Sequence, residues 1–183
     1  MLVHSAGVAR TGALAELTRE DWRHQYEVNV VAVADLTRRL LPALRAAGGT
    51  VVAINSGSGH RSNPGGGSYA ASKFALRALT DALREEERGR VRVSSVHPGR
   101  VDTDMQVELQ AGRGRDYVAD DHLRPASVAA AVRLVTAHVV EENLADSVII
   151  RCAAGNTASR RVPERCGYVQ NGIQPASEPL GDG

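Results

Sequence analysis

Three polar side chains, Ser56, Tyr69 and Lys73, stand at spacings that could transfer a proton. Ser56 follows a short run rich in β-branched residues, Thr50–Ile54, which predicts a buried strand. Tyr69 and Lys73 are four positions apart in a segment, residues 68–88, whose apolar side chains recur at helical spacing, so they share one helix face. A neighbouring ammonium lowers the pKa of a phenol from its usual ~10. The serine hydroxyl can hold a substrate oxygen while the tyrosine donates or accepts its proton.

The sequence has 22 lysine and arginine residues in total. Lys73 is the only lysine among them. A tunable ammonium one turn from a tyrosine favours a functional pair over its alternative, an exposed tyrosine and lysine on a helix surface. Ser58 competes with Ser56 for the serine role, but the spacing to Tyr69 favours Ser56. No acid is placed to orient His60, which we expect on the loop surface or as a wall of the substrate site.

Four motifs, in order, resemble the short-chain dehydrogenase/reductase family. The segment L-V-H-S-A-G at residues 2–7 is similar to the family's N-N-A-G, with His4 and Ser5 in place of both asparagines. V-N-V at residues 28–30 resembles the segment of the fourth catalytic residue, here Asn29. The spacing from Ser56 to Tyr69 and Lys73 resembles the active-site segment, and H-P-G-R-V-D-T-D-M at residues 97–105 resembles the segment beside the nicotinamide.

The resemblance implies an α/β fold: part of a Rossmann-like doubly wound parallel sheet, its second half, flanked by helices. It also implies an NAD(P)-dependent oxidoreductase that transfers a hydride between nicotinamide and an alcohol or carbonyl substrate. Tyr69 would be the acid/base, Lys73 would lower its pKa and hold the nicotinamide ribose, and Ser56 would orient the substrate oxygen. Asn29 would hold a water in the proton relay; the alternative is a buried asparagine that bonds a helix carbonyl. The implied cofactor contacts are Ala6, Gly7, Tyr69, Lys73, Pro98, Gly99, Val101 and Thr103, with no metal.

Other elements must position these residues. Residues 1–3 are at most the end of a strand, followed by a loop over 4–12. Thr18 and Asp21 form a capping pair that opens a long helix over 19–47, which Pro42 should kink or split. Residues 91–96 predict a strand, and Pro98-Gly99 turns the chain at its carboxyl end, where ligands bind in open α/β sheets. Residues 106–123 predict a substrate lid, Pro125 begins a helix to about 138, and 143–151 predicts a last strand.

Composition excludes several classes of function. A chain of 183 residues with a formal net charge of +1 gives no electrostatic sign of a nucleic-acid or membrane partner. No apolar run is long enough to cross a bilayer, and Cys152 and Cys166 follow no metal-ligand pattern, which predicts a cytoplasmic protein. The family's helices that match 19–47 and 68–88 build a four-helix contact, so the resemblance implies a homo-oligomer with a small-molecule substrate.

Both ends of the sequence depart from the family. No G-x-x-x-G-x-G phosphate loop precedes Leu2, so we expect an N-terminally truncated chain. The alternative to an enzyme is therefore a catalytically inactive remnant, or an interaction fragment, unable to bind cofactor. The substrate and the choice between NAD and NADP stay open, because neither is encoded in these motifs.

Near the other end, residues 151–172 resemble the last shared motif of acyl-CoA-dependent N-acetyltransferases, with matches at Asn156, Ser159, Gly167 and Tyr168. Pro163 stands where many members carry a tyrosine acid, and no acetyl-CoA pyrophosphate loop precedes it, so acetyl transfer is not expected. We predict a dehydrogenase-like half over 1–145, joined to the new segment between His138 and Asp146, an acetyltransferase-like segment over 146–173 and a disordered tail over 174–183. The alternative is an ordinary polar tail.

Overall fold

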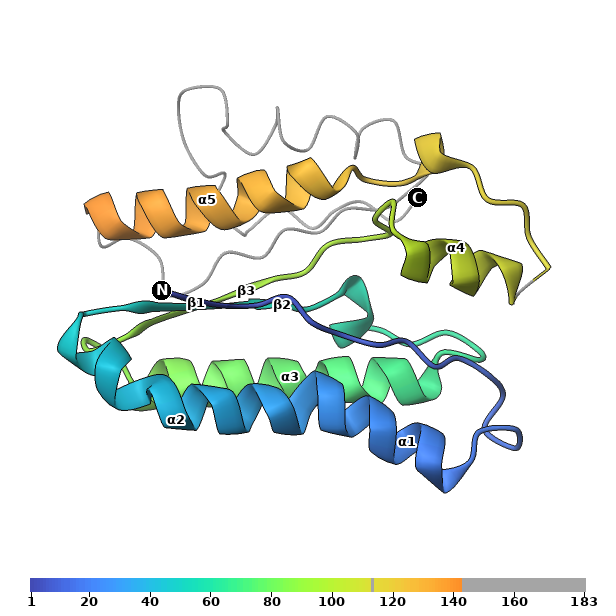
Figure 1. The fold of residues 1–183 in the computed structure, drawn as a ribbon, viewed down its shortest axis with the longest axis horizontal. Coiled ribbons are helices and arrows are strands. Elements are labelled where there is room, and N and C mark those ends of the chain that lie inside the picture. Colours follow the sequence, from blue (N-terminus) through green and yellow to red (C-terminus); the bar gives the residue numbers. More distant parts are fainter. Residues whose placement is uncertain (113, 143–183) are drawn as a thin grey trace.

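A parallel three-stranded sheet lies between two layers of helices in the computed structural model, which describes residues 1–112 and 114–142 (Figure 1). The strands are β1 (Leu2–His4), β2 (Thr50–Ile54) and β3 (Arg92–Val96), in the order β1-β2-β3. Val3 pairs with Val52, and Val52 pairs with Ser94. The predicted α/β class with a parallel sheet is confirmed.

The central strand β2 packs on both faces because successive side chains alternate across a sheet. Val51 and Ala53 face the first helical layer, where Val51 contacts Leu44 and Ala53 contacts Leu76 in two apolar clusters. Val52 faces the other layer and packs with Val135. A strand buried on both sides explains why its sequence is continuously apolar instead of alternating.

The predicted helix over 19–47 is present as α1 (Arg19–Tyr26), a π-helical turn η1 (Glu27–Val31) and α2 (Ala32–Ala46). The capping box of Thr18 and Asp21 opens it as expected. Of the kink or split predicted at Pro42, the split is wrong, because α2 continues through this exposed proline. The π-helical turn was not predicted.

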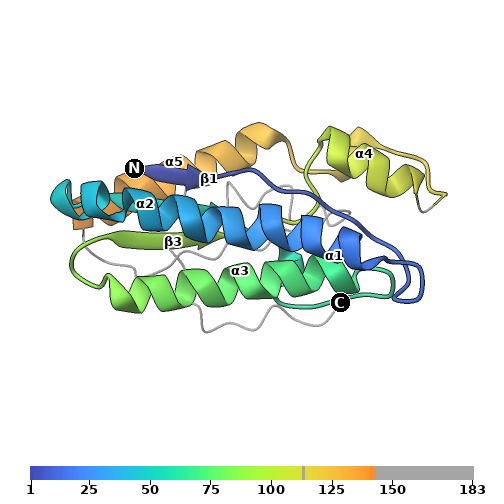
Figure 2. The ribbon, with the colours of Figure 1, turned by 60° about the horizontal axis from the view of Figure 1, so that its bottom comes forward.

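Helix α3 (Gly67–Glu86) lies beside α1 and α2 on the same face of the sheet (Figure 2). It begins and ends within two residues of the predicted 68–88. Between β2 and α3 lies a short 3₁₀ turn, η2 (Gly57–Gly59). Both β–α–β connections therefore return on one side of the sheet (Figure 2).

The remaining elements cover the carboxyl ends of the strands and the opposite face (Figure 1). Helix α4 (Asp104–Ala111) and the 3₁₀ turn η3 (Ala119–Asp121) occupy the region predicted as a polar lid, and α4 itself was not predicted. Helix α5 (Pro125–Glu142) begins at the predicted proline and ends four residues beyond the predicted 138. The strand predicted over 143–151, the acetyltransferase-like segment and the tail lie outside the described residues. In the described part of the chain, none of the helices has the length and apolarity needed to cross a membrane.

Candidate active site

Three loops meet where the strands end: residues 5–7 after β1, 55–56 after β2 and 97–99 after β3. Backbone hydrogen bonds continue the pairing of β2 and β3 beyond the strands. Asn55 N donates to Val96 O at 2.8 Å, and Gly57 N donates to Pro98 O at 3.0 Å. Ser56 lies between these two bonds, so its backbone is fixed relative to the loop after β3.

Tyr69 and Lys73 lie in the first two turns of α3 and meet Ser56, as the spacing predicted. The hydroxyl of Ser56 interacts with the phenol of Tyr69. The ammonium of Lys73 lies 5.8 Å from the ring centre of Tyr69 and donates to Ile54 O at 3.3 Å. Lys73 is only 4% exposed, which is rare for a lysine without a carboxylate partner.

Burial shifts the pKa of both groups on the helix. It lowers the pKa of Lys73 to about 8. It raises the pKa of the Tyr69 phenol, an effect that the hydrogen bond from Ser56 opposes only in part. The expected lowering of the Tyr69 pKa is therefore wrong for this structure, because desolvation of the phenolate outweighs the neighbouring groups. At pH 7 the phenol holds its proton while roughly nine-tenths of Lys73 is charged.

Asn29 lies in the π-helical turn and is 1% exposed. Its Nδ2 donates to Val8 O at 2.9 Å and to Ser72 Oγ at 3.0 Å, while its Oδ1 accepts from Val8 N at 2.9 Å. These partners belong to the loop after β1 and to α3, so the alternative of a bond to a helix carbonyl is wrong. π-Helical turns often occur at functional sites, and this one brings the loop after β1 against the active-site helix.

Gly7 stands where that loop passes closest to the polar groups. A Cβ atom at Gly7 would lie 3.3 Å from Asn29 Oδ1 and 3.7 Å from Lys73 Nζ. A larger side chain would have to displace the asparagine or the ammonium. The missing side chain thus leaves room for a ligand beside Lys73.

The predicted cofactor contacts share one cavity of about 1030 Å³ with three of the four catalytic candidates. Its lining includes Ser56 and all eight of the predicted contacts, Ala6, Gly7, Tyr69, Lys73, Pro98, Gly99, Val101 and Thr103. Asn29 is not part of the lining and lies behind Gly7, which is. The volume, the buried ammonium and the space at Gly7 fit a nicotinamide dinucleotide.

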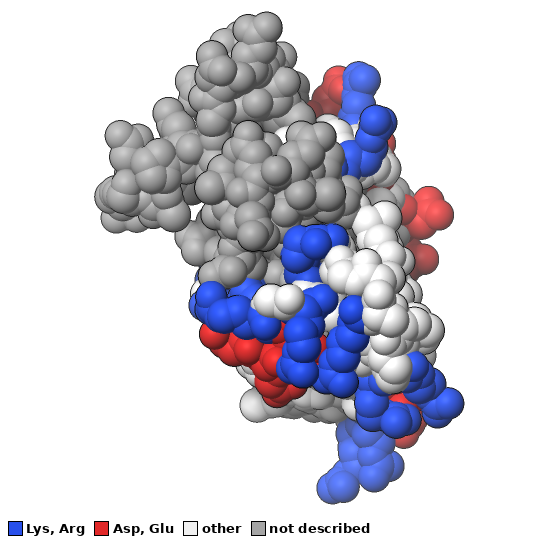
Figure 3. All heavy atoms as spheres, turned by 90° about the vertical axis from the view of Figure 1, so that its left-hand side faces the viewer, with Lys and Arg blue, Asp and Glu red and all other residues white. Residues whose placement is uncertain are grey.

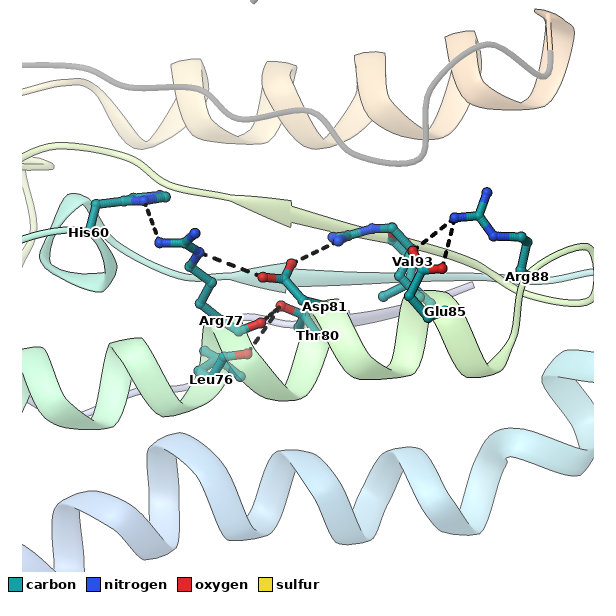
Figure 4. A network of polar contacts seen from close by, with 9 residues as sticks. His60, Leu76, Arg77, Thr80, Asp81, Glu85, Arg88 and Val93 are labelled. Atoms are coloured by element: carbon teal, nitrogen blue, oxygen red, sulfur yellow. Dashed lines mark hydrogen bonds and ion pairs between the residues drawn. The ribbon is translucent and has the colours of Figure 1, made fainter.

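His97 supports the site, a role that was not predicted from the sequence. Its Nδ1 lies 3.0 Å from Ser56 O, and because a carbonyl only accepts, Nδ1 carries the proton. Burial lowers the pKa of His97 to about 4, so the ring is neutral at pH 7. His60 packs on that ring at 4.4 Å and contacts Arg77, rather than lining the cavity as a substrate wall (Figure 4).

Gln25 is a second supporting residue outside the predicted set. It is fully buried, and its Nε2 donates to Ser68 Oγ at the start of α3. Its Oε1 accepts from Arg10 N at 2.6 Å. Gln25 therefore ties α1 to the active-site helix and to the loop after β1. A single glutamine in a polar helix carries no sequence signal for this role.

Comparison with known protein families matches residues 1–114 to short chain dehydrogenase. The chain belongs to the short-chain dehydrogenase family. The match includes Asn29, Ser56, Tyr69 and Lys73, the residues whose geometry is described above.

Curated relatives agree with the family. The chain is 44% identical over 109 residues to an uncharacterized NAD-dependent oxidoreductase of Mycobacterium tuberculosis, covering 57% of this chain and 39% of that protein. It is 37% identical over 122 residues to the 2,3-dihydro-2,3-dihydroxybenzoate dehydrogenase of Escherichia coli, covering 66% of this chain and 46% of that protein. The chain thus spans less than half the length of these relatives.

Solved structures of family members share the fold. The oxidoreductase yciK of Escherichia coli superposes with a TM-score of 0.72 at 25% identity, covering 80% of this chain and 59% of that chain. An alcohol dehydrogenase of Thermococcus sibiricus, complexed with 5-hydroxy-NADP, superposes with a TM-score of 0.65 at 27% identity, covering 81% and 60% respectively.

Proposed function

We propose that this chain performs the proton-transfer chemistry of an NAD(P)-dependent oxidoreductase that interconverts an alcohol and a carbonyl compound. One observation carries the proposal: Ser56, Tyr69 and Lys73 line a single cavity. The names of an NAD-dependent relative and of an alcohol dehydrogenase with a bound NADP derivative support the choice of cofactor and reaction.

Tyr69 is the acid in carbonyl reduction. Its phenol holds a proton at pH 7 because burial raises its pKa, and it can donate that proton to the oxygen of a substrate. Ser56 donates a second hydrogen bond to the same oxygen, which polarises the carbonyl and stabilises the developing alkoxide. The bond from His97 to Ser56 O keeps this serine in place.

Lys73 provides the positive charge that lowers the free-energy cost of proton release from Tyr69. As the phenol loses its proton, the ammonium 5.8 Å from its ring centre stabilises the phenolate. The same ammonium can bond the ribose hydroxyls of the nicotinamide nucleotide. When bound, the nicotinamide ring supplies or accepts the hydride.

The remaining residues would orient the cofactor and return the proton. Ala6 and Gly7 would contact it from the loop after β1, and Pro98, Gly99, Val101 and Thr103 from the segment after β3. We assign Asn29 to the proton relay: it holds the loop after β1 through both of its bonds to Val8, and its Oδ1 keeps a second lone pair that a water could use.

The test is the initial rate of NADH or NADPH oxidation by the full chain with a reactive small diketone such as 2,3-butanedione. We expect turnover with at least one nucleotide, and a loss of more than about a hundredfold in Tyr69→Phe, since a general acid contributes ~10²–10⁴-fold. Tyr26→Phe on α1 is the matched control and should keep its rate. If Tyr69→Phe and Tyr26→Phe keep the same rate, Tyr69 is not the acid.

We also infer a homo-oligomer formed through α2 and α3, which lie side by side on one face (Figure 2). Val31, Leu36 and Leu40 are 48%, 44% and 39% exposed on η1 and α2, and Phe74 on α3 is 42% exposed. Apolar side chains gathered on one helix pair favour association of two copies.

A further inference from the structure

The cavity at the active site is lined by cationic side chains. Its basic lining residues are Arg61, Lys73, Arg100, Arg115 and Arg133, and among its described lining residues there is no Asp or Glu. The chain as a whole has 22 basic and 21 acidic residues, so the two signs are not spread evenly over the molecule. A concave site with one sign of charge attracts ligands of the opposite sign.

Arginines elsewhere in the described structure commonly have carboxylate partners. Arg45 binds the buried carboxylate of Glu87 at 2.5 Å, and Arg88 binds Glu85 at 2.8 Å. Figure 3 shows the end of the molecule where α2 and α3 terminate, opposite the cavity, with blue and red side chains in contact. Along α3, Asp81 forms an ion pair with Arg77 at 3.6 Å (Figure 4). Asp81 also accepts from Arg84 at 2.8 Å.

Three of the cavity arginines differ from these. Within the described residues, the guanidinium groups of Arg61, Arg100 and Arg115 have neither a carboxylate nor any other hydrogen-bond partner. Each comes from a different segment: the loop between η2 and α3, the turn after β3, and the turn after α4. Three unneutralised guanidinium groups converging from separate elements indicate a site for an anion.

Their backbones are held in place. Arg100 O accepts from Leu123 N at 2.9 Å, and Arg115 N donates to Gln110 O at 3.0 Å. Arg61 follows Ser56 by five residues and is joined to it through η2. Arg100 stands between the predicted cofactor contacts Gly99 and Val101. Arg61 belongs to the segment that carries Ser56, and Arg115 to the segment predicted as the substrate lid.

We propose that the substrate carries a carboxylate in addition to the reacting alcohol or carbonyl, and that Arg61 and Arg115 bind this carboxylate. The proposal rests on the proposed function, because Ser56 and Tyr69 define which end of the substrate reacts. A guanidinium matches a carboxylate with two parallel hydrogen bonds and stays charged at every working pH. The same lining disfavours cationic substrates.

The test measures the binding of malonate, succinate and glutarate to the full chain at constant ionic strength. Binding is monitored by Trp22 fluorescence and by the melting temperature. Malonamide, succinamide and glutaramide are neutral controls of equal length. We expect at least one diacid to raise the melting temperature, with no effect of its diamide. Arg61→Gln and Arg115→Gln should each weaken diacid binding about tenfold. Arg23→Gln, on the exposed surface of α1, should leave it unchanged.

Inorganic pyrophosphate tests the other source of negative charge, the cofactor. The proposal is wrong if the two arginine variants weaken the binding of pyrophosphate but not the binding of any diacid. Arg61 and Arg115 would then bind the phosphates of the dinucleotide. Equal effects of diacids and diamides, or diacid binding unchanged in both arginine variants, also overturn it. Tyr69→Phe should bind the diacid normally, because the carboxylate site does not include the phenol. A failure of the proposed reaction would therefore leave the diacid-binding result valid, and a failure of diacid binding would leave the proposed reaction valid.

Discussion

Burial acts in opposite senses on the two ionisable groups of the active-site helix. It raises the pKa of the Tyr69 phenol and lowers that of the Lys73 ammonium to about 8, so each group is driven toward its neutral form. A proton that leaves Tyr69 creates a phenolate beside an ammonium, and each charge then offsets the desolvation of the other. Before the reaction the site holds a proton donor, which favours carbonyl reduction near neutral pH.

The pKa of Lys73 sets the expected pH dependence of this reduction. Below pH 8 the ammonium is present, and as pH rises through about 8 it is lost, so kcat/KM for carbonyl reduction should fall tenfold per pH unit above that value. In Lys73→Arg, whose charge does not titrate in this range, the fall near pH 8 should disappear even if the overall rate is lower. An unchanged profile in Lys73→Arg would show that another group titrates.

His97 makes the free energy of unfolding decrease at acidic pH. Its pKa is about 4 in the folded chain and 6.5 in the unfolded chain, so the unfolded state takes up the proton first as pH falls. Stability is complete above pH 6.5 and decreases by up to ~3 kcal/mol as pH falls to 4. Burial also lowers the pKa of His4, so this residue adds to the loss of stability in acid. Urea unfolding of His97→Gln should lack most of this decrease.

The control for His97 is His24→Gln, an exposed residue of α1. It should reproduce the acid sensitivity of the wild type. If His97→Gln loses as much stability between pH 6.5 and 4 as the wild type does, the buried ring is not the group responsible.

Among the elements, the π-helical turn joins fold and site. Asn29→Ala removes two hydrogen bonds to Val8 and one to Ser72, and takes away the side-chain partners of the partly buried backbone groups of Val8. We expect a loss of ~2–4 kcal/mol in the free energy of unfolding, measured with urea. Asn63→Ala, at an exposed loop position, should cost less than ~0.5 kcal/mol. A similarly small cost for Asn29→Ala would contradict this structural role.

The sequence was informative about elements whose signal is local. The β-branched run of β2 fixed its bounds at Thr50 and Ile54, and the capping box of Thr18 marked the start of α1. The π-helical turn was missed because one extra residue changes the helical phase without altering composition. Helix α4 was missed because its polar and apolar residues show no clear stripe. The split at Pro42 did not occur, since an exposed proline need not end a helix that packing holds together.

At the candidate site, sequence spacing identified Ser56, Tyr69 and Lys73, but Asn29 and the loops were identified only through the family resemblance. The direction of the Tyr69 pKa could not be predicted, because it depends on burial, which spacing does not reveal. The contacts of His97 and Gln25 are long-range in the chain, and the type of either residue indicates no partner. The three unpaired cavity arginines meet only when the loops fold together.

At the scale of the whole molecule, the helix pair α2 and α3 predicts self-association. Phe74→Glu places a charge on that face and should shift a dimer or larger assembly toward the monomer in light scattering after gel filtration. Val118→Glu, an equally exposed apolar residue between α4 and η3, is the control and should not alter the mass. If the two variants give the same mass as the wild type, α2 and α3 do not form the contact.

The central claim is that the cavity beside Tyr69 and Lys73 binds a nicotinamide dinucleotide, and a titration tests it most directly. The full chain is titrated with NADH and NADPH while Trp22 fluorescence and melting temperature are recorded. We predict that at least one nucleotide raises the melting temperature, and that Lys73→Met weakens this binding about tenfold. If the chain is folded and binds neither nucleotide, the account is contradicted and the non-catalytic interpretation stands.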